Sequence, residues 1–141
     1  MEVSVSIAVV TAVVLAALGT RYLAVRQAVR GDAYNTAGRI GLLLLEGWRS
    51  SSTPSTYNPV VKFAGQLTLT AAAGPVAPSG FTALGSYRVV LDGRNYYVTL
   101  AYKNATTTAP ATLHVTVGFR QNYQAGSLSA GDNYVRLTTY D

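Results

Sequence analysis

The side chains that most often carry out catalysis are scarce in this sequence. Among its 141 residues are six acidic residues, a single histidine and no cysteine. The sequence contains no nucleophile elbow, phosphate-binding loop or metal-ligand spacing, and without cysteine neither disulfides nor thiolate metal sites can form. His114 falls on the polar side of an alternating run, which predicts an ordinary surface residue. We therefore expect a protein that is not an enzyme and that has no cofactor.

One carboxylate is notable for its position. Glu2 directly precedes residues 3–20, a mostly apolar run without a charged side chain. An acidic residue suits the positive end of a helix dipole, so Glu2 is at least a polar residue at the end of an apolar helix. Its role depends on what surrounds that helix.

The apolar run predicts the first structural element. Its eighteen residues, at about 1.5 Å each, cover roughly 27 Å, the lower limit for a helix that crosses a membrane. A cleavable secretory signal would begin with basic residues and have a shorter apolar core, whereas an acid comes first here. We therefore expect a retained helix whose apolar side chains are Val3, Val5, Ile7, Val9, Val10, Val13, Val14, Leu15 and Leu18.

Helical periodicity continues beyond Thr20. Apolar residues recur at spacings of three and four, and charged residues occupy the other side. This apolar stripe consists of Tyr22, Val25, Val29, Ala33, Ala37, Ile40, Leu44 and Trp48. The pattern predicts one long helix, or two nearly coaxial ones, over 1–49, apolar at 1–20 and amphipathic behind.

The remaining residues, 50–141, have the pattern of one small β domain. A Ser/Thr/Pro segment ends the helix, and two short runs at 60–63 and 66–70 are candidate strands. An Asp92-Gly93 pair predicts a hairpin turn between two alternating runs. The main expected strands are 87–91, 96–102, 113–119 and 134–140. We therefore expect an α+β fold, in which the back half of the helix covers one face of a four-stranded antiparallel β-meander.

Composition favours a protein that contacts other proteins. The formal net charge is +5, but charged residues make up only 12%, about half of the usual quarter. Ten tyrosines against three phenylalanines suit half-exposed positions at interfaces. The basic residues form no run, so we expect only a weak attraction to nucleic acid, which Arg88, Arg94 and Arg120 would carry.

The first fifty residues resemble the type IV pilin and pseudopilin family. The segment EVSVSIAVVTAVVLAALGTRYLAV looks like the mature N-terminus of such subunits, in which a lone acid leads an apolar run. The following RQAVRGDAYNTAGRIGLLLLEGWRSS is similar to the amphipathic segment of minor pilins and type II secretion pseudopilins. The resemblance implies a structural subunit for adhesion or secretion, held in the inner membrane before assembly. Copies of it, other pilins and an assembly platform would then build a helical filament at the cell surface, with the apolar residues in its core.

The resemblance also assigns a role to the N-terminus. In that family a prepilin peptidase removes a short basic leader, often methylates the new N-terminus, and leaves a glutamate at the fifth mature position. That carboxylate pairs with the N-terminal amine of a neighbouring subunit. Glu2 is the matching acid, so either Met1 stands at the fourth mature position or Met1 is the mature start in a different register. Because Arg21, Arg26 and Arg30 follow the apolar run, against the positive-inside rule for such a subunit, we expect lysine or arginine directly upstream of Met1 in the gene.

Other features leave alternatives open. The helix would open at Gly19 and Thr20 in an assembled filament, as in several family members, or Gly19 is simply a tolerated glycine. Asn104-Ala105-Thr106 matches the N-glycosylation acceptor pattern and lies in an expected loop. The alternative to a filament subunit is a single-span membrane-anchored β domain that binds a ligand, a glycan or DNA as a monomer.

Overall fold

The computed structural model describes the backbone of residues 2–51, 54–120, 128–129 and 131–140, and the side chains of 13–51, 55–120, 128–129 and 131–140. By its internal contacts the chain divides into two compact units, Met1–Ala33 and Tyr34–Asp141. Helix α1, Glu2–Arg49, supplies the described part of the first unit and the beginning of the second.

Helix α1 is one continuous helix of 48 residues, which confirms the helical prediction. No proline occurs within these residues, so every backbone N–H after the first turn can join the helical ladder. The helix ends at Arg49, whose charge suits the negative end of the helix dipole. Just beyond it, the Ser50 amide donates to the Glu46 carbonyl at 3.0 Å and the Ser50 hydroxyl donates to the Gly47 carbonyl at 3.0 Å.

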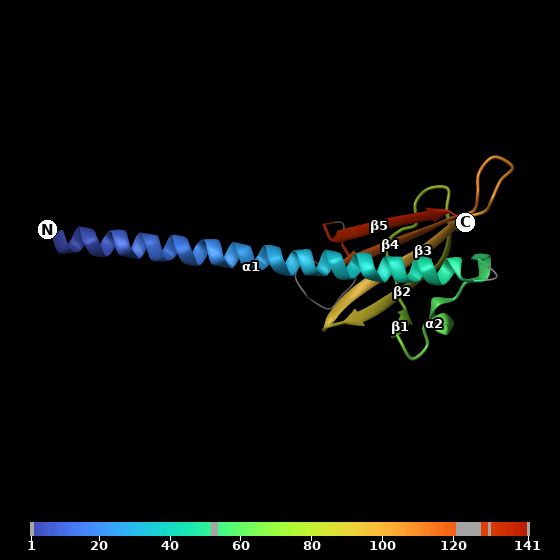
Figure 1. The fold of residues 1–141 in the computed structure, drawn as a ribbon, viewed down its shortest axis with the longest axis horizontal. Helices are drawn as coiled ribbons and strands as arrows, with labels where there is room; N and C mark the ends of the chain where they lie inside the picture. The colour runs from blue at the N-terminus through green and yellow to red at the C-terminus, as the bar shows by residue number, and fades with distance from the viewer. Residues whose placement is uncertain (1, 52–53, 121–127, 130, 141) are drawn as a thin grey trace. The chain divides into compact units, whose positions relative to one another are not determined.

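The second unit contains a five-stranded antiparallel sheet in which each strand pairs with the next along the chain (Figure 1). The strands are β1 (Leu69–Ala71), β2 (Thr82–Leu91), β3 (Arg94–Lys103), β4 (Thr112–Phe119) and β5 (Asn133–Tyr140). The meander is thus confirmed, but the predicted count of four strands is wrong. The short β1 adds a fifth and overlaps the last two residues of the candidate strand at 66–70. Its three residues pair with Tyr87, Arg88 and Val89 of β2.

The predicted strand at 60–63 is also wrong. Pro59–Lys62 forms the short helix α2, which follows a 3₁₀ turn, η1, at Pro54–Thr56. The side chain of Asn58 accepts a 3.0 Å hydrogen bond from the Val60 amide, and Pro59 takes the first helical position. This N-cap and the fixed φ of proline favour a helical turn over the β preference of the two valines.

The hairpin between β2 and β3 turns where the sequence predicts. Asp92 and Gly93 both have positive φ, 51° and 73°, and Leu91 pairs with Arg94. These are the dihedral signs of a type I′ turn, which matches the twist of the two strands. The alternation on either side is therefore in the expected register.

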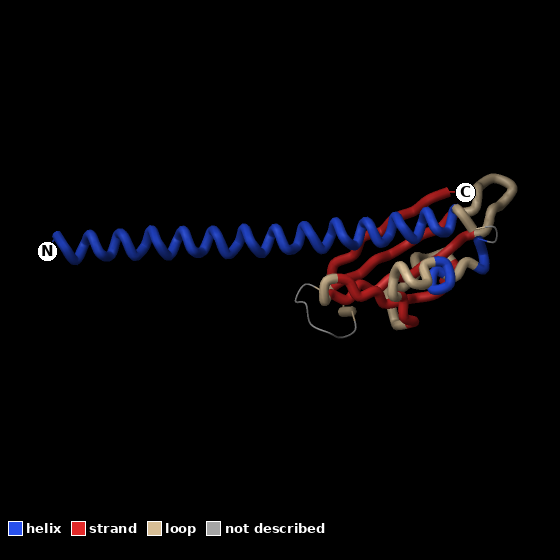
Figure 2. Tube along the Cα trace, turned by 60° about the horizontal axis from the view of Figure 1, so that its bottom comes forward, coloured by secondary structure: helices blue, strands red, loops and turns tan. Residues whose placement is uncertain are grey.

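One face of the sheet packs against residues 34–49 of α1 (Figure 2). The helix contributes Ala37, Ile40, Leu44 and Trp48, all buried, and the sheet contributes the alternating apolar residues of β3 and β4. Gly41 approaches β5 so closely that a Cβ there would lie 2.5 Å from Cδ1 of Leu137. The back half of the helix therefore covers the apolar face of the sheet, as expected.

The opposite face of the sheet is covered as well. Thr99 and Thr116 are each 3% exposed and His114 is 9% exposed. The Gly/Pro/Ala segment between β1 and β2 lies over this face, since a Cβ on Gly74 would lie 2.6 Å from Oγ1 of Thr99 and the Phe81 ring lies 5.6 Å from that of His114. The prediction of an ordinary surface histidine is wrong, because this segment buries the polar face that the alternation left to solvent.

Candidate functional site

Helix α1 leaves a row of large apolar side chains uncovered in the first unit. Exposed fractions are 64% for Leu15, 59% for Leu18, 63% for Tyr22 and 62% for Val25. Their spacing of three, four and three places them on one side of the helix, and we call them the front stripe. Single exposed apolar residues are ordinary, but a contiguous row of them marks an interaction surface.

Four of the predicted filament-core residues have described side chains, and all four are exposed: Val13, Val14, Leu15 and Leu18. The others, namely Val3, Val5, Ile7, Val9 and Val10, lie outside the residues whose side chains are described. So do Met1 and the side chain of Glu2. The proposed pairing of that carboxylate with a neighbour's amine therefore stays a prediction.

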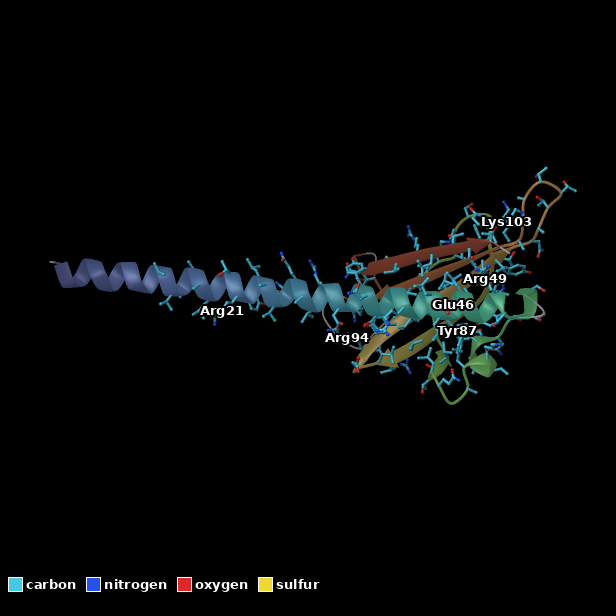
Figure 3. The ribbon with its side chains drawn as sticks, viewed as in Figure 1. Arg21, Glu46, Arg49, Tyr87, Arg94 and Lys103 are labelled. Atoms are coloured by element: carbon cyan, nitrogen blue, oxygen red, sulfur yellow. The ribbon has the colours of Figure 1, made fainter. Side chains whose placement is uncertain are left out.

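The front stripe has a positively charged border. At about 100° per residue, Arg21 and Arg26 fall on the two sides of the stripe. The guanidinium carbon of Arg26 lies 5.6 Å from the centroid of the Tyr22 ring, within the range of a cation–π contact. Figure 3 labels Arg21 on this part of α1. No acidic residue occurs between Glu2 and Asp32, so a partner of the front stripe meets only positive charge.

Gly19 and Thr20, the predicted opening point, are helical in the single chain. The Thr20 hydroxyl donates a 2.9 Å hydrogen bond to the Ala17 carbonyl, and a Cβ on Gly19 would meet no atom within 4 Å. The predicted opening concerns the assembled filament. The structure of a single chain does not test it, so opening at Gly19 and Thr20 stays a prediction.

A groove of about 390 Å³ lies beside the back half of α1 in the second unit. We call it the helix–hairpin groove, and its lining consists of Thr36, Arg39, Ile40, Leu43, Leu67, Leu91 and Asp92. Four of these side chains are apolar, and Arg39 and Asp92 supply one charge of each sign. The carboxylate of Asp92 has no ion pair within the part of the chain that the structure describes. The groove combines an apolar surface with two charges, which is typical of a binding site.

The sequence pattern does not indicate this groove. Its lining comes from α1, from the segment before β1 and from the hairpin turn, and only the fold brings these segments together. One feature of the sequence does point to an additional apolar surface here. The four consecutive leucines at 42–45 cover more of the helix circumference than a single core-facing stripe requires. Leu44 and Leu45 are buried, whereas Leu42 and Leu43 remain 53% and 40% exposed.

His114 is the centre of a polar cluster beneath Phe81. Its Nδ1 lies 2.9 Å from the Thr138 hydroxyl and its Nε2 lies 3.0 Å from the Thr116 hydroxyl. Burial, and secondarily the positive charge of Arg136, lower the pKa of His114. The imidazole is therefore neutral near pH 7. Its hydrogen bond with Thr138 ties β4 to β5, whereas its hydrogen bond with Thr116 lies within β4.

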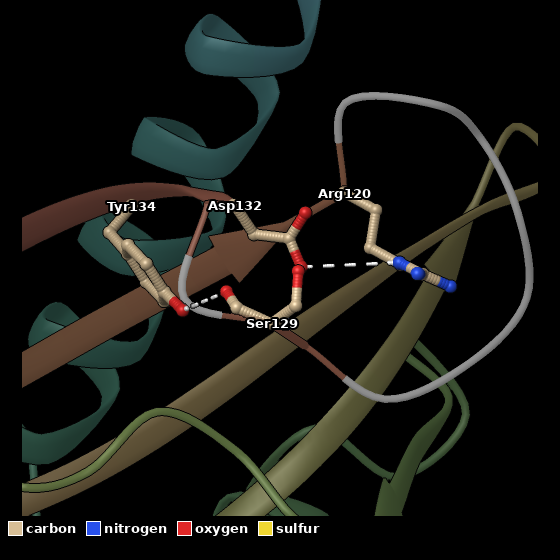
Figure 4. Close-up of polar contacts among 4 residues, drawn as sticks. All are labelled: Arg120, Ser129, Asp132 and Tyr134. Atoms are coloured by element: carbon tan, nitrogen blue, oxygen red, sulfur yellow. Dashed lines mark hydrogen bonds and ion pairs between the residues drawn. The ribbon is translucent and has the colours of Figure 1, made fainter.

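A second polar cluster joins the end of β4 to the start of β5 (Figure 4). Asp132 Oδ2 accepts hydrogen bonds from the amide and the hydroxyl of Ser129, at 2.7 and 3.2 Å, and lies 3.9 Å from Nε of Arg120. The Tyr134 hydroxyl donates to the Ser129 carbonyl at 3.2 Å. This cluster holds both ends of the β4–β5 connection, and it occupies Arg120, one of the three arginines expected to attract nucleic acid.

Asn104 is exposed in the connection between β3 and β4. Nearby, the Thr106 amide donates to the Ala109 carbonyl at 2.8 Å, and the Thr106 hydroxyl accepts from the Ala109 amide at 3.1 Å. The acceptor asparagine is accessible, while the hydroxyl of its tripeptide is engaged in a local turn. Glycosylation of Asn104 stays a prediction.

Comparison with known proteins finds no matching family model, no similar curated protein and no similar solved structure. Within the described residues, no helix is sufficiently long and apolar to pass through a membrane. Over the same residues, no three His, Cys, Asp or Glu side chains are grouped so that they could hold a metal ion. The front stripe and the helix–hairpin groove are the two surfaces from which we infer a function.

Proposed function

We propose that the protein is a structural subunit of a filament of the type IV pilus or pseudopilus kind and that it assembles through its N-terminal helix. The observation that carries the proposal is the front stripe, whose large apolar side chains are exposed in the single chain. Covering apolar surface is favourable by about 25 cal/mol per Å². A helix with this row of side chains is therefore stabilised by an apolar partner, which equivalent helices in a filament would supply.

The second unit supports the same proposal. Residues 34–49 of α1 pack on the sheet, so a chain held by its helix carries the β domain with it. In a filament the helices form the core and the β domains form the outer layer. The mechanism is assembly, not catalysis: the helix exchanges lipid contacts in the inner membrane for contacts with other helices. Glu2 would pair with a neighbour's N-terminal amine, and the helix would open at Gly19 and Thr20 where that packing requires it.

The test compares sheared surface material with the membrane fraction of cells that express the chain. Electron microscopy and immunoblotting should find filaments that contain the wild-type chain. Leu18→Asn should reduce the filament fraction, because an amide then replaces an apolar side chain in the packed core. Val76→Asn is the matched control, since Val76 is 92% exposed on the β domain, and this variant should assemble normally.

A chain found only in the membrane fraction would contradict the filament proposal. That result would favour the alternative, a membrane-anchored β domain that acts as a monomer. Equal assembly of Leu18→Asn and wild type would remove the front stripe as the basis of the proposal.

A further inference from the structure

We propose that the front stripe of one copy docks in the helix–hairpin groove of a second copy. The inference rests on the proposed filament function and specifies the apolar partner of the front stripe, which is the back half of a neighbour's α1 together with the residues that line the groove beside it. Its occupant is residues 15–26 of another chain, and its receptor is the surface between α1 and the β2–β3 turn.

The two surfaces match in apolar character. The groove, at about 390 Å³, has Ile40, Leu43, Leu67 and Leu91 along its walls. Leu43, one of these four, is 40% exposed in the single chain. An amphipathic helix enters such a groove with side chains at intervals of three and four, and Leu15, Leu18, Tyr22 and Val25 have that spacing. The front stripe thus supplies the apolar cover that the groove lacks.

Two carboxylates on the receptor are complementary to the positive border of the front stripe. Arg21 and Arg26 border the front stripe, and neither has an ion pair within the part of the chain that the structure describes. On the receptor, Asp92 lines the groove, and Glu46 lies on α1 one turn after Leu43 with an exposed side chain (Figure 3). Both carboxylates likewise lack an ion pair among the described residues. Docking would give these arginines and carboxylates partners of opposite charge.

Arg39 lines the same groove as Asp92 but carries the opposite charge, so the two residues should have opposite effects on docking. An approaching arginine is attracted by Asp92 and repelled by Arg39. Neutralising Asp92 should therefore weaken docking, whereas neutralising Arg39 should strengthen it. A purely apolar contact would respond to neither change.

The geometry of the pair suits a polymer. The front stripe and the groove are different surfaces of the chain, so the contact is heterologous, and each copy offers one of each. Heterologous contacts build a closed ring where the rotation between copies closes and an open helical filament where it does not, and the proposed filament is the open case. The proposal therefore predicts a series of cross-linked oligomers and not a single dimer.

Disulfide trapping can test the contact cleanly because the chain has no cysteine. Filaments would be sheared from cells that express the full chain with Leu18→Cys and Leu91→Cys together, and then mildly oxidised. A ladder of dimers, trimers and larger species on a non-reducing gel is expected. Leu18→Cys with Val90→Cys is the matched control: Val90 is exposed on the opposite face of β2, so this pair should stay monomeric. Ala24→Cys with Leu91→Cys moves the helical cysteine to the other side of α1 and should also fail to cross-link.

Charge variants test the same contact independently. In the double-cysteine background, Asp92→Asn should lower the ladder yield about two- to five-fold, as expected for one exposed ion pair, and Arg39→Gln should raise it. Asp92→Asn keeps the hairpin, since Asn-Gly is the preferred sequence for a type I′ turn.

The outcomes separate this inference from the proposed function. Filaments that assemble but show no Leu18–Leu91 cross-link would overturn the docking and leave the filament function intact. Cross-links confined to the monomer would overturn it as well, because the helix would then fold onto its own groove. If the double variant does not assemble, the two single-cysteine chains can be mixed in detergent. Mixed dimers would then support the contact, and their absence would count against it.

Discussion

The hydroxyl of Tyr34 donates a 2.7 Å hydrogen bond to Oδ1 of Asn133, which joins α1 to the first residue of β5 across 99 residues of sequence. The Tyr34 ring also meets the Phe119 ring edge-on, with centroids 4.9 Å apart. These contacts hold the helix to both β4 and β5 at one end of the sheet. The first and last elements of the second unit are therefore linked by a specific polar contact as well as by the apolar core.

Tyr34→Phe should lower the free energy of unfolding by about 1 kcal/mol, because it removes the hydrogen bond and keeps the ring. Urea denaturation of the full chain in detergent measures this change. Tyr140→Phe is the control, since the Tyr140 side chain is 64% exposed and its hydroxyl has no hydrogen bond among the described residues. Equal losses in both variants would show that the contact with Asn133 contributes nothing.

Gly47 and Gly38 form a matched pair of glycines on the same helix. A Cβ on Gly47 would lie 2.6 Å from the Tyr57 hydroxyl and 2.7 Å from Cζ of Phe63, and both of these rings are buried. A Cβ on Gly38 would meet nothing within 4 Å. Gly38→Ala should therefore stabilise the protein by about 1 kcal/mol through helix propensity. Gly47→Ala should destabilise it by about 1–3 kcal/mol, because the added methyl group overpacks the core. Thermal unfolding of the two variants and the wild type measures both effects. A rise in the unfolding temperature of both variants would contradict this explanation.

His114 should make stability depend on pH. Its pKa is lowered in the folded state, so below the ordinary histidine value of about 6.5 the unfolded chain binds a proton that the folded chain still excludes. The contribution of His114 is therefore fully present above that pH and is lost as the pH falls. Urea unfolding between about pH 7.5 and pH 5 should show decreasing stability in the wild type. The decrease should be smaller in His114→Gln, and an unchanged slope in that variant would assign the effect to other groups.

Asp132 should matter more as a hydrogen-bond acceptor than as a charge. Asp132→Ala leaves the Ser129 amide without its 2.7 Å partner and should cost about 1–3 kcal/mol. Asp132→Asn can still accept that bond through its amide oxygen, and the 3.9 Å ion pair with a partly exposed Arg120 contributes little. The asparagine variant should therefore unfold close to the wild-type urea concentration. Equal losses for both variants would instead point to the charge.

Much of the fold could be predicted because its signals are local. The three- and four-residue spacing indicated α1, and alternation with Asp92-Gly93 indicated β2, β3 and their register. The errors have a common cause. Val60 and Val61 favour a strand locally, but the Asn58 cap and Pro59 start a helical turn. Of the candidate strand at 66–70 only the end becomes part of β1, because the residues that join the sheet are those that pair with β2, Leu69–Ala71.

By itself, the sequence determined a long helix with an apolar stripe and a meander with one apolar face, because periodicity directly encodes which side of an element is buried. The sequence could not determine which polar residues the rest of the chain would bury. His114 is an example, because its burial by the segment before β2 depends on the path of a loop. Nor could the sequence place Asp92 beside Arg39 and Leu43, which lie about fifty residues away in α1. Only the tertiary structure formed that groove, because it packs the helix and the hairpin turn against each other.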